Sequence, residues 1–230
     1  MTQDRPPIIW ARRLLDLVLS LLALTLLGPV ILLVAVLIKL SSPGPVLYVA
    51  QRAGYKGQPF GLLKFRTMRA GADRHGSITA QDDSRVFGVG RILRLFKLDE
   101  LPQILNVLRG EMSIVGPRPE DLEIVRGYYT AEQRQVLEVL PGLTGMPQVR
   151  FFPEFSQIDT GGMDPQEHYC QVILPMRLEM DLEYIRTRSF WRDLYLIGAT
   201  VFLITLKAPY IALFGQRTRP VPNSWRSKQA

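Results

Sequence analysis

The residue types best suited to chemistry gather between residues 94 and 119, in RLFKLDELPQILNVLRGEMSIVGPRP. Two adjacent acids, Asp99 and Glu100, stand in this segment. Carboxylates next to bound phosphates are the usual protein ligands of Mg²⁺, so both residues are candidate metal ligands. An ionised aspartate beside a phosphate can also act as a nucleophile and form an aspartyl-phosphate. One hypothesis for this pair is therefore phosphoryl chemistry.

A structural interpretation of Asp99 is also open. Glu100 and Pro102 are favoured types for a first helical turn, and Gly110 supplies a C-terminal stop, so Asp99 is placed to cap a helix over 101–109. In that position the helix N-terminus would keep the carboxylate ionised and would also attract a phosphate. The local pattern is compatible with both capping and catalysis, and caps are common.

Four basic residues are candidates for binding phosphate near this pair. Lys64 and Arg66 lie two positions apart in a β-prone segment and would share one face of a strand. Arg94 precedes Asp99 by five positions, and Arg118 lies between two prolines in GPRP. A guanidinium on such a rigid loop suits bidentate phosphate recognition. The alternative is a solvated basic face that lies on anionic lipid.

The overall composition narrows the class of protein. The 230 residues contain 28 Lys and Arg against 21 Asp and Glu, a net charge of +7, which predicts an anionic partner. A hydrophobic fraction of 47% excludes a disordered chain. The single cysteine cannot form an intrachain disulfide, so nothing requires an oxidising compartment. Because no nucleic-acid-reading module is present, we expect no nucleic-acid partner.

Residues 17–38 form an uncharged apolar run that would extend about 33 Å as one helix, enough to cross the hydrocarbon core of a bilayer. Gly28 and Pro29 near its middle predict a kink or break. Basic residues flank the run on both sides: Arg5, Arg12 and Arg13 before it, and Lys39, Arg52 and Lys56 after it. The positive-inside rule therefore favours a re-entrant helix with both ends in the cytosol. A kinked single-pass helix is the alternative, whereas a signal peptide is disfavoured because no cleavage site follows the run.

The rest of the chain predicts an α+β fold, mostly helical with a small β element. The expected elements are strands over 46–52 and 59–68 and helices over 85–96, 101–109, 120–139 and 166–187. Residues 70–84 are polar and predict a mobile loop, and 194–206 is too short for a span and predicts an interfacial or core helix. We expect a membrane anchor over 1–40, a catalytic domain with interfacial helices over 41–206 and a basic tail over 207–230.

Several motifs resemble, in the same order, those of the bacterial sugar transferase family, the small monotopic phosphoglycosyl transferases. They are KFRTM, LDELPQILNVLRGEMSIVGPRPE, PGLTG and MRLEMDLEYIRTRSFWRDL, and the resemblance covers residues 10–205. It implies a monotopic enzyme on the cytoplasmic face of the bacterial inner membrane. Such an enzyme moves a sugar phosphate from a UDP-sugar to polyprenyl (undecaprenyl) phosphate and starts the assembly of a cell-surface glycan.

The resemblance also implies roles for residues. Asp99 would attack the β-phosphorus of the UDP-sugar and expel UMP, Glu100 with Mg²⁺ would neutralise the developing charge, and Arg94 and Arg118 would clamp phosphate oxygens. Gly28-Pro29 would match the break of the family's re-entrant anchor. After PGLTG this chain reads MPQVRFF where many members have Trp-Ala-Gln-Val, so the identity of the sugar stays open.

The sequence leaves open the oligomeric state and a second possible function. The chain lacks the large N-terminal multi-helix extension of some relatives, so we expect a minimal catalytic unit, either monomeric or a homodimer. A non-catalytic scaffold, whose basic face binds anionic membrane lipid, is the alternative function. The two functions differ in a simple respect, because only the enzyme would turn over a UDP-sugar.

Overall fold

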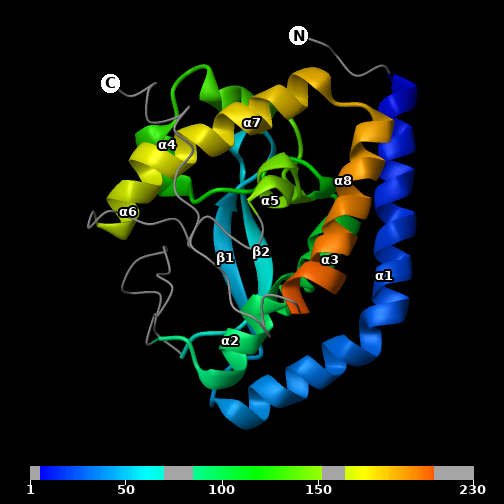
Figure 1. The fold of residues 1–230 in the computed structure, drawn as a ribbon, viewed down its shortest axis with the longest axis vertical. Helices are drawn as coiled ribbons and strands as arrows, with labels where there is room; N and C mark the ends of the chain where they lie inside the picture. Colours follow the sequence, from blue (N-terminus) through cyan, green and yellow to red (C-terminus); the bar gives the residue numbers. More distant parts are fainter. Residues whose placement is uncertain (1–5, 70–84, 152–163, 210–230) are drawn as a thin grey trace.

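The structure, a computed structural model, describes residues 6–69, 85–151 and 164–209 (Figure 1). The predicted loop over 70–84 and most of the predicted tail lie outside these residues. In chain order the elements are α1 (Pro6–Ser41), β1 (Leu47–Ala53), η1 (Tyr55–Gly57), β2 (Pro59–Phe65), α2 (Gly88–Leu95), η3 (Leu98–Glu100), α3 (Gln103–Arg109), β3 (Ser113–Val115), α4 (Leu122–Tyr128), η4 (Gln133–Glu138), β4 (Gly142–Thr144), α5 (Met146–Arg150), α6 (Pro165–His168), η6 (Tyr169–Ile173), α7 (Leu174–Thr187), α8 (Phe190–Phe202) and η7 (Leu203–Lys207). The protein is therefore mostly helical with a small β element, as predicted.

The N-terminal helix α1 contains 36 residues and is long and apolar enough to cross a membrane. Pro29 lies inside it, and Figure 1 shows that α1 changes direction part-way along its length. The helix continues through Pro29, so the chain bends without an interruption. Only 11% of the most apolar 18-residue stretch of α1 is buried inside the protein. Most of the apolar surface of α1 therefore faces outward.

Two arginines near the start of α1 bind the body of the protein. Arg13 donates hydrogen bonds to the carbonyls of Val107 and Leu108 in the last turn of α3, at 2.7 and 2.9 Å. Arg12 forms an ion pair with Asp193 of α8, with 2.9 Å between Nε and Oδ2. A cation at the C-terminal carbonyls of a helix is favourable. These arginines, predicted as membrane-flanking charges, thus also fasten α1 to α3 and α8.

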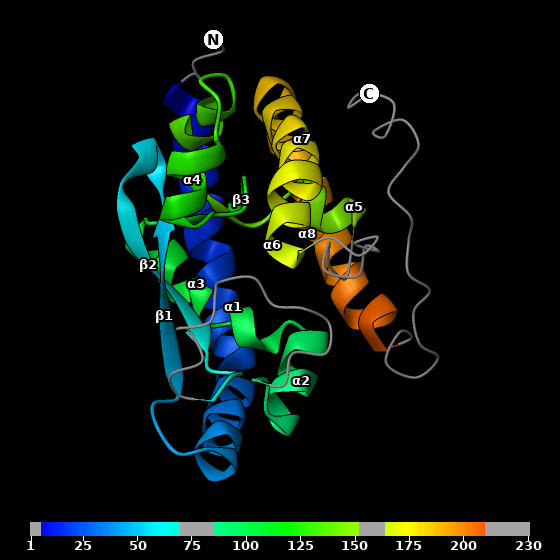
Figure 2. The same cartoon turned by 90° about the vertical axis from the view of Figure 1, so that its left-hand side faces the viewer.

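The β element consists of two small pairings in the described part of the chain. Strands β1 and β2, both predicted as strands, pair as an antiparallel hairpin, with Leu47 opposite Phe65 and Ala53 opposite Pro59. Strands β3 and β4 pair in parallel, and the sequence did not predict them. From the side, the hairpin lies along one edge of the molecule and α7 and α8 lie toward the other (Figure 2).

The helix predicted over 120–139 is wrong, because the structure divides it into α4 and the 3₁₀ helix η4. Thr130 and Gln133 explain the division. The Gln133 side chain accepts from the Thr130 backbone N–H at 2.9 Å, and the Thr130 hydroxyl accepts from the Gln133 backbone N–H at 3.2 Å. This reciprocal capping box starts a new helical turn. The helix predicted over 166–187 is confirmed as α6, η6 and α7, which follow one another without a gap.

Two hydrophobic clusters hold the helices around the hairpin. Val34 and Ile38 in the second half of α1 pack with Phe65 at the end of β2 and with Leu93 of α2. A second cluster joins the end of β1 to α4 and α7. Burying such side chains stabilises the fold by about 1.5–3 kcal/mol each. The first cluster therefore attaches α1 to β2 and α2, and the second attaches α7 to β1 and α4.

Candidate active site

The two acids Asp99 and Glu100 form the 3₁₀ turn η3, which directly precedes α3. The N-cap of η3 is Lys97 and the N-cap of α3 is Pro102, so the interpretation of Asp99 as a helix cap is wrong. Lys97 has a φ of 56°, a left-handed conformation that is costly for a residue other than glycine. Only 8% of Asp99 and 9% of Glu100 are exposed. The turn thus holds two carboxylates in a largely buried place, and Gly110 ends α3 as predicted, with a φ of 81°.

Helix α3 is held firmly, and this fixes the turn before it. Asn106 is fully buried, and its Oδ1 accepts from the backbone N–H of Leu63 at 3.0 Å. Its Nδ2 donates to the carbonyl of Gly61 at 2.8 Å. Since Asn106 satisfies two backbone groups of β2, and Arg13 caps the other end of α3, the helix cannot slide relative to the hairpin. Lys64, also on β2, is thereby set opposite the acid pair.

Glu100 is the centre of a small charge cluster. Its Oε1 lies 2.6 Å from Arg118 Nη2 and 3.5 Å from Lys64 Nζ. Burial alone would raise the pKa of Glu100, but the positive charges of Arg118, Lys64 and Lys97 outweigh it, so the pKa lies well below its ordinary value. Burial lowers the pKa of Lys64, and the Glu100 charge opposes this only in part. Glu100 is therefore ionised at neutral pH and holds two cations beside Asp99.

The loop that carries Arg118 is fixed by strand β4. The Gly116 N–H donates to the carbonyl of Thr144 at 2.9 Å, and the Gly142 N–H donates to the carbonyl of Pro117 at 2.8 Å. The two backbones approach so closely that a Cβ on Gly142 would lie 2.1 Å from the Gly116 nitrogen. The PGLTG motif is therefore explained by packing, because only glycine permits this contact with the GPRP loop.

Replacing Gly142 with Ala is expected to destabilise the protein by about 3 kcal/mol or more, since backbone would have to move. For a chain of this size the melting temperature in detergent should fall by more than about 6 °C. Gly127→Ala is the matched control, because nothing lies within 4 Å of a Cβ at that helical position. Equal melting temperatures for the two variants would contradict the close-packing explanation.

The other two predicted phosphate-binding residues make different contacts. The Nε of Arg94 donates to the Thr67 hydroxyl at 2.8 Å. Arg66 is 5% exposed, and its guanidinium donates to the carbonyls of Ser42 and Pro43 at 2.7 and 2.5 Å. Arg66 thus joins the end of β2 to the segment after α1. The structure brings Lys64 and Arg118 together at Glu100, and it directs Arg66 to backbone carbonyls.

A second charge cluster, formed by Glu120, Tyr169 and Arg177 and called the Glu120 cluster below, was missed by the sequence reasoning. Glu120 Oε2 accepts from the Tyr169 hydroxyl at 2.5 Å and lies 2.7 Å from Arg177 Nη2. Burial alone would raise the pKa of Glu120, but Arg177 and the Tyr169 hydrogen bond keep it below its ordinary value. No sequence signal links Glu120 to the other two residues, because it lies 49 positions before Tyr169. Lys97 was also missed, although its place two positions before Asp99 was a usable signal.

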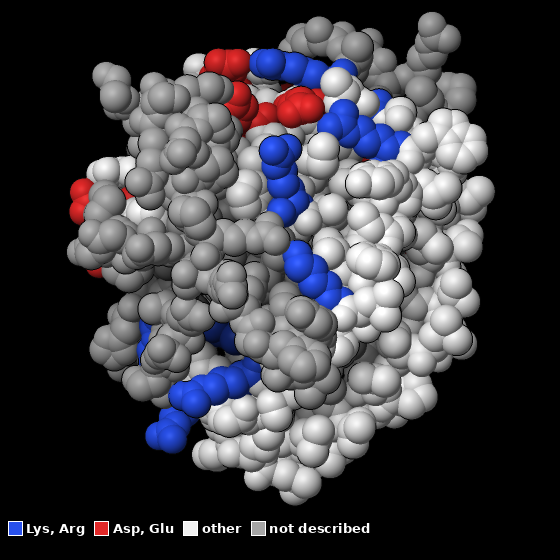
Figure 3. Space-filling model, in the orientation of Figure 1, with Lys and Arg blue, Asp and Glu red and all other residues white. Residues whose placement is uncertain are grey.

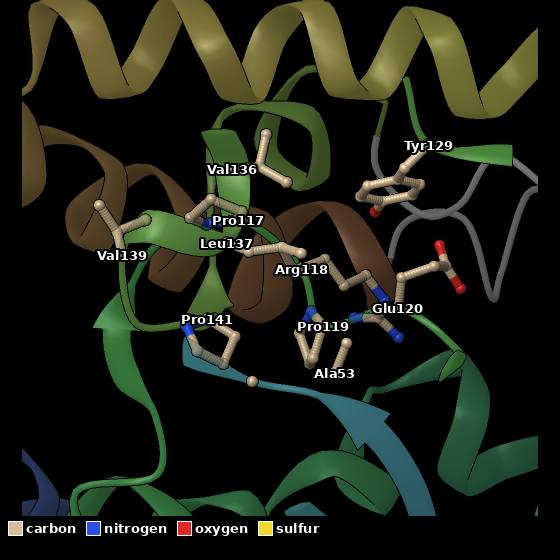
Figure 4. A pocket seen from close by; sticks show the side chains of 11 residues that line it. Ala53, Pro117, Arg118, Pro119, Glu120, Tyr129, Val136, Leu137, Val139 and Pro141 are labelled. Carbon is tan, nitrogen blue, oxygen red and sulfur yellow. The ribbon is translucent and has the colours of Figure 1, made fainter. Parts of the chain in front are cut away.

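A small pocket lies beside the Arg118 loop (Figure 4). Arg118, Glu120 and Tyr129 lie at one end of it, whereas the other end is lined by apolar side chains that include Val139 and Pro141. The pocket therefore lies between the loop that carries Arg118 and η4. Glu120, a member of the Glu120 cluster, lies at the polar end of the pocket.

Asp181 on α7 is a buried acid next to the Glu120 cluster. It is 1% exposed, neither of its carboxylate oxygens accepts a hydrogen bond within the described residues, and its Oδ2 lies 4.0 Å from Arg177 Nε. Burial raises the pKa of Asp181 from 3.8 to about 7, although Arg177 opposes this. At neutral pH the burial of the Asp181 carboxyl therefore lowers the free energy of unfolding.

The pKa of Asp181 predicts how stability depends on pH. Because the folded state holds this proton more tightly than the unfolded state, its contribution to stability falls as pH rises from 3.8 to about 7 and then levels off. Asp181→Asn removes this dependence. We expect the variant to gain about 5 °C in melting temperature relative to wild type between pH 5 and pH 8. A difference that stays constant across these pH values would contradict the prediction.

Most of the chain is similar to known proteins. Residues 8–207 match the family model described as "Bacterial sugar transferase". A UDP-glucose:undecaprenyl-phosphate glucose-1-phosphate transferase of Caulobacter vibrioides is 44% identical over 194 residues, which cover 83% of this chain and 68% of that protein.

Two further relatives differ in length and name. A UDP-N-acetylgalactosamine-undecaprenyl-phosphate N-acetylgalactosaminephosphotransferase of Aeromonas hydrophila is 35% identical over 83% of this chain and 42% of its own length. An exopolysaccharide production protein, ExoY, of Sinorhizobium fredii is 36% identical over 85% of this chain and 86% of its own length. With most of its length matched by the family model and by these relatives, the chain belongs to the bacterial sugar transferase family.

Proposed function

We propose that the protein transfers a sugar 1-phosphate from a UDP-sugar to polyprenyl (undecaprenyl) phosphate, releases UMP and thereby initiates the synthesis of a cell-surface glycan. The family and the names of its relatives support a polyprenyl-phosphate sugar-phosphate transferase. The observation that carries the proposal is the buried Asp99–Glu100 turn with Arg118 and Lys64 gathered on Glu100. This arrangement suits a diphosphate substrate and a carboxylate nucleophile.

The proposed reaction has two displacements at phosphorus. In the first, a carboxylate oxygen of Asp99 forms a bond to the β-phosphorus of the UDP-sugar while the bond from that phosphorus to the bridging oxygen breaks, and UMP leaves with the bonding electrons. In the second, an oxygen of polyprenyl phosphate attacks the same phosphorus and the Asp99 carboxylate leaves. The product is a polyprenyl diphosphate sugar, and Asp99 is regenerated.

Arg118 and Lys64 would stabilise the negative charge that builds on the transferring phosphoryl group. Arg118 uses Nη2 for its short contact with Glu100, and a guanidinium has five N–H donors, so it can hold Glu100 and a phosphate oxygen together. Glu100 keeps both cations in place before substrate arrives. Such preorganised charge is usually the largest single contribution to transition-state stabilisation.

Magnesium fits this site as an ion that binds mainly through the substrate. In the described part of the chain no group of three or more His, Cys, Asp or Glu residues could hold a metal. Asp99 and Glu100 offer two carboxylates, which suffices for an ion whose other ligands are diphosphate oxygens and water. Glu100 also contacts Arg118 and Lys64, so at this residue the ion would share the carboxylate with two cations. When bound, the ion would neutralise phosphate charge.

This proposal predicts that the activity depends on a divalent metal. Treating the protein with EDTA is expected to lower UMP release at least about a hundredfold, and added Mg²⁺ is expected to restore it, because phosphoryl transfer without charge neutralisation is strongly disfavoured. UMP is measured by a coupled luminescence assay. Full turnover in excess EDTA would remove Mg²⁺ from the proposal without removing the role of Asp99.

The surface supports a location at the membrane. Figure 3 shows a broad area without charged side chains on the side where α1 and α8 lie in Figure 1, and Lys and Arg side chains border it. Large apolar side chains of α8, such as Trp191 and Tyr195, are 76% and 66% exposed. We propose that this area enters the cytoplasmic leaflet of the bacterial inner membrane, that the basic border binds anionic lipid, and that the bend in α1 makes the anchor re-entrant.

A donor panel tests the proposed function. Purified protein in nanodiscs is mixed with undecaprenyl phosphate, Mg²⁺ and either UDP-glucose or UDP-N-acetylgalactosamine, labelled with ³²P at the β-phosphate. We expect UMP release, label in the lipid fraction and, without the lipid acceptor, label on the protein. Salt-sensitive lipid binding without turnover of any UDP-sugar would favour the membrane-surface scaffold.

A further inference from the structure

The Glu120 cluster lies outside the proposed reaction, yet it is built from groups that are costly to bury. Side-chain exposure is 5% for Arg177 and 8% for Glu120. Arg177 Nη1 also donates to the Tyr169 hydroxyl at 2.5 Å, so the three side chains contact one another. A buried ion pair often adds little net stability compared with apolar side chains of the same size. Stability alone therefore does not explain why these three polar side chains are buried together.

Contacts from the Glu120 cluster, β1 and β4 hold the chain on both sides of Arg118. Glu120 is two residues after Arg118, and its carbonyl accepts from the Ala53 N–H at the end of β1 at 2.9 Å. Arg177 Nη2 donates to the carbonyl of Arg118 itself at 3.4 Å. On the other side, the Pro117 carbonyl accepts from Gly142 at 2.8 Å. Both peptide groups that flank Arg118 are thus fixed from outside the loop.

We infer that Arg177 is a positioning residue, which holds the backbone at Arg118 so that the Arg118 guanidinium stays on Glu100 and faces the phosphates of the substrate. The first step of this inference, that Arg177 holds the backbone at Arg118, stands without the proposed function. The second step, that Arg118 then faces the phosphates of the substrate, rests on the proposed function, because it takes Arg118 as a phosphate-binding residue. Helix α7 therefore contributes to the site from 59 residues beyond Arg118.

Hydrogen exchange of the backbone amides tests the first step. In Arg177→Met we expect the backbone N–H groups of the non-proline residues in 115–121 to exchange about tenfold faster, because the contact to the Arg118 carbonyl and the ion pair with Glu120 are both lost. Tyr169→Phe keeps the packing and leaves no unpaired charge, and we expect about fivefold faster exchange at the same amides. Arg186→Met is the matched control, since Arg186 lies on the same helix but pairs with Glu132 on the surface.

Kinetics on the same variants tests the second step. We expect Arg177→Met to lower kcat/KM for the UDP-sugar about a hundredfold, as a small displacement of a positioned group can do. In an Arg118→Ala background the same substitution should change kcat/KM less than about twofold further, because the group that it positions is already absent. A general structural defect would instead lower activity equally in both backgrounds.

The outcomes separate the two claims. Unchanged exchange at 115–121 in both Arg177→Met and Tyr169→Phe, or an equal increase over the whole chain, would overturn the positioning role. A hundredfold loss in both backgrounds would overturn the link to Arg118. If wild type turned over no UDP-sugar, the proposed function would fail, and the exchange measurement would still decide whether Arg177 holds the loop.

Discussion

Asp99→Asn is expected to abolish sugar-phosphate transfer, with UMP release at least about a thousandfold below wild type, because an amide cannot form the proposed bond to phosphorus. The variant should also carry no ³²P after incubation with labelled UDP-sugar. The substitution keeps the size of a side chain that is only 8% exposed, so the η3 turn should persist. UMP release and label on the protein are measured in nanodiscs, together with the melting temperature.

Asp164→Asn is the control for this result. Asp164 lies before α6 and accepts hydrogen bonds from the backbone N–H groups of Gln166 and Glu167. Asparagine caps helices as well as aspartate does, so this variant should retain wild-type activity. If Asp99→Asn were folded and released UMP at the wild-type rate, Asp99 would not be the nucleophile.

Arg118→Ala is expected to produce the second large effect, a fall in kcat/KM for the UDP-sugar of about a hundredfold to a thousandfold. The substitution removes a phosphate-binding group and also removes the 2.6 Å contact that holds Glu100. Arg118→Lys should recover only part of the loss, because an ammonium group lacks the planar fork of a guanidinium. Initial rates over a range of UDP-sugar concentrations separate KM from kcat.

Arg126→Ala serves as the control for Arg118. Arg126 is an exposed arginine in the last turn of α4, outside the charge cluster at Glu100. Its removal lowers the net charge by the same amount and is expected to leave kcat/KM within about twofold of wild type. Equal losses in Arg118→Ala and Arg126→Ala would mean that the effect comes from overall charge and not from the site.

Much of the fold could be predicted from local sequence motifs. The apolar run of α1, the hairpin strands, the α3 stop at Gly110 and the continuous helical segment from α6 to α7 are all confirmed. These features depend on neighbours within a few residues, such as a glycine that can adopt a positive φ. The division between α4 and η4 was missed, although the Thr130–Gln133 capping box that causes it is visible in the sequence.

The cap assigned to Asp99 shows the limit of such local reasoning. One acid, Glu100, and a proline after Asp99 fit a helix N-terminus, but Lys97 adopts a left-handed conformation and moves the start of the turn. Likewise Lys64 and Arg66 appeared equivalent by their spacing. The strand ends at Phe65, so Arg66 donates to the carbonyls of Ser42 and Pro43 and Lys64 reaches Glu100.

The sequence by itself determined the family, the apolar helix and the acid pair with its basic surroundings, because motifs of adjacent residues are sufficient for these. Tertiary structure alone decided which two cations contact Glu100, why Gly142 must be glycine, and that α7 holds the Arg118 loop through Arg177. Such contacts join residues 18 to 59 positions apart. They depend on how α3, β4 and α7 pack in three dimensions, and no local pattern specifies that packing.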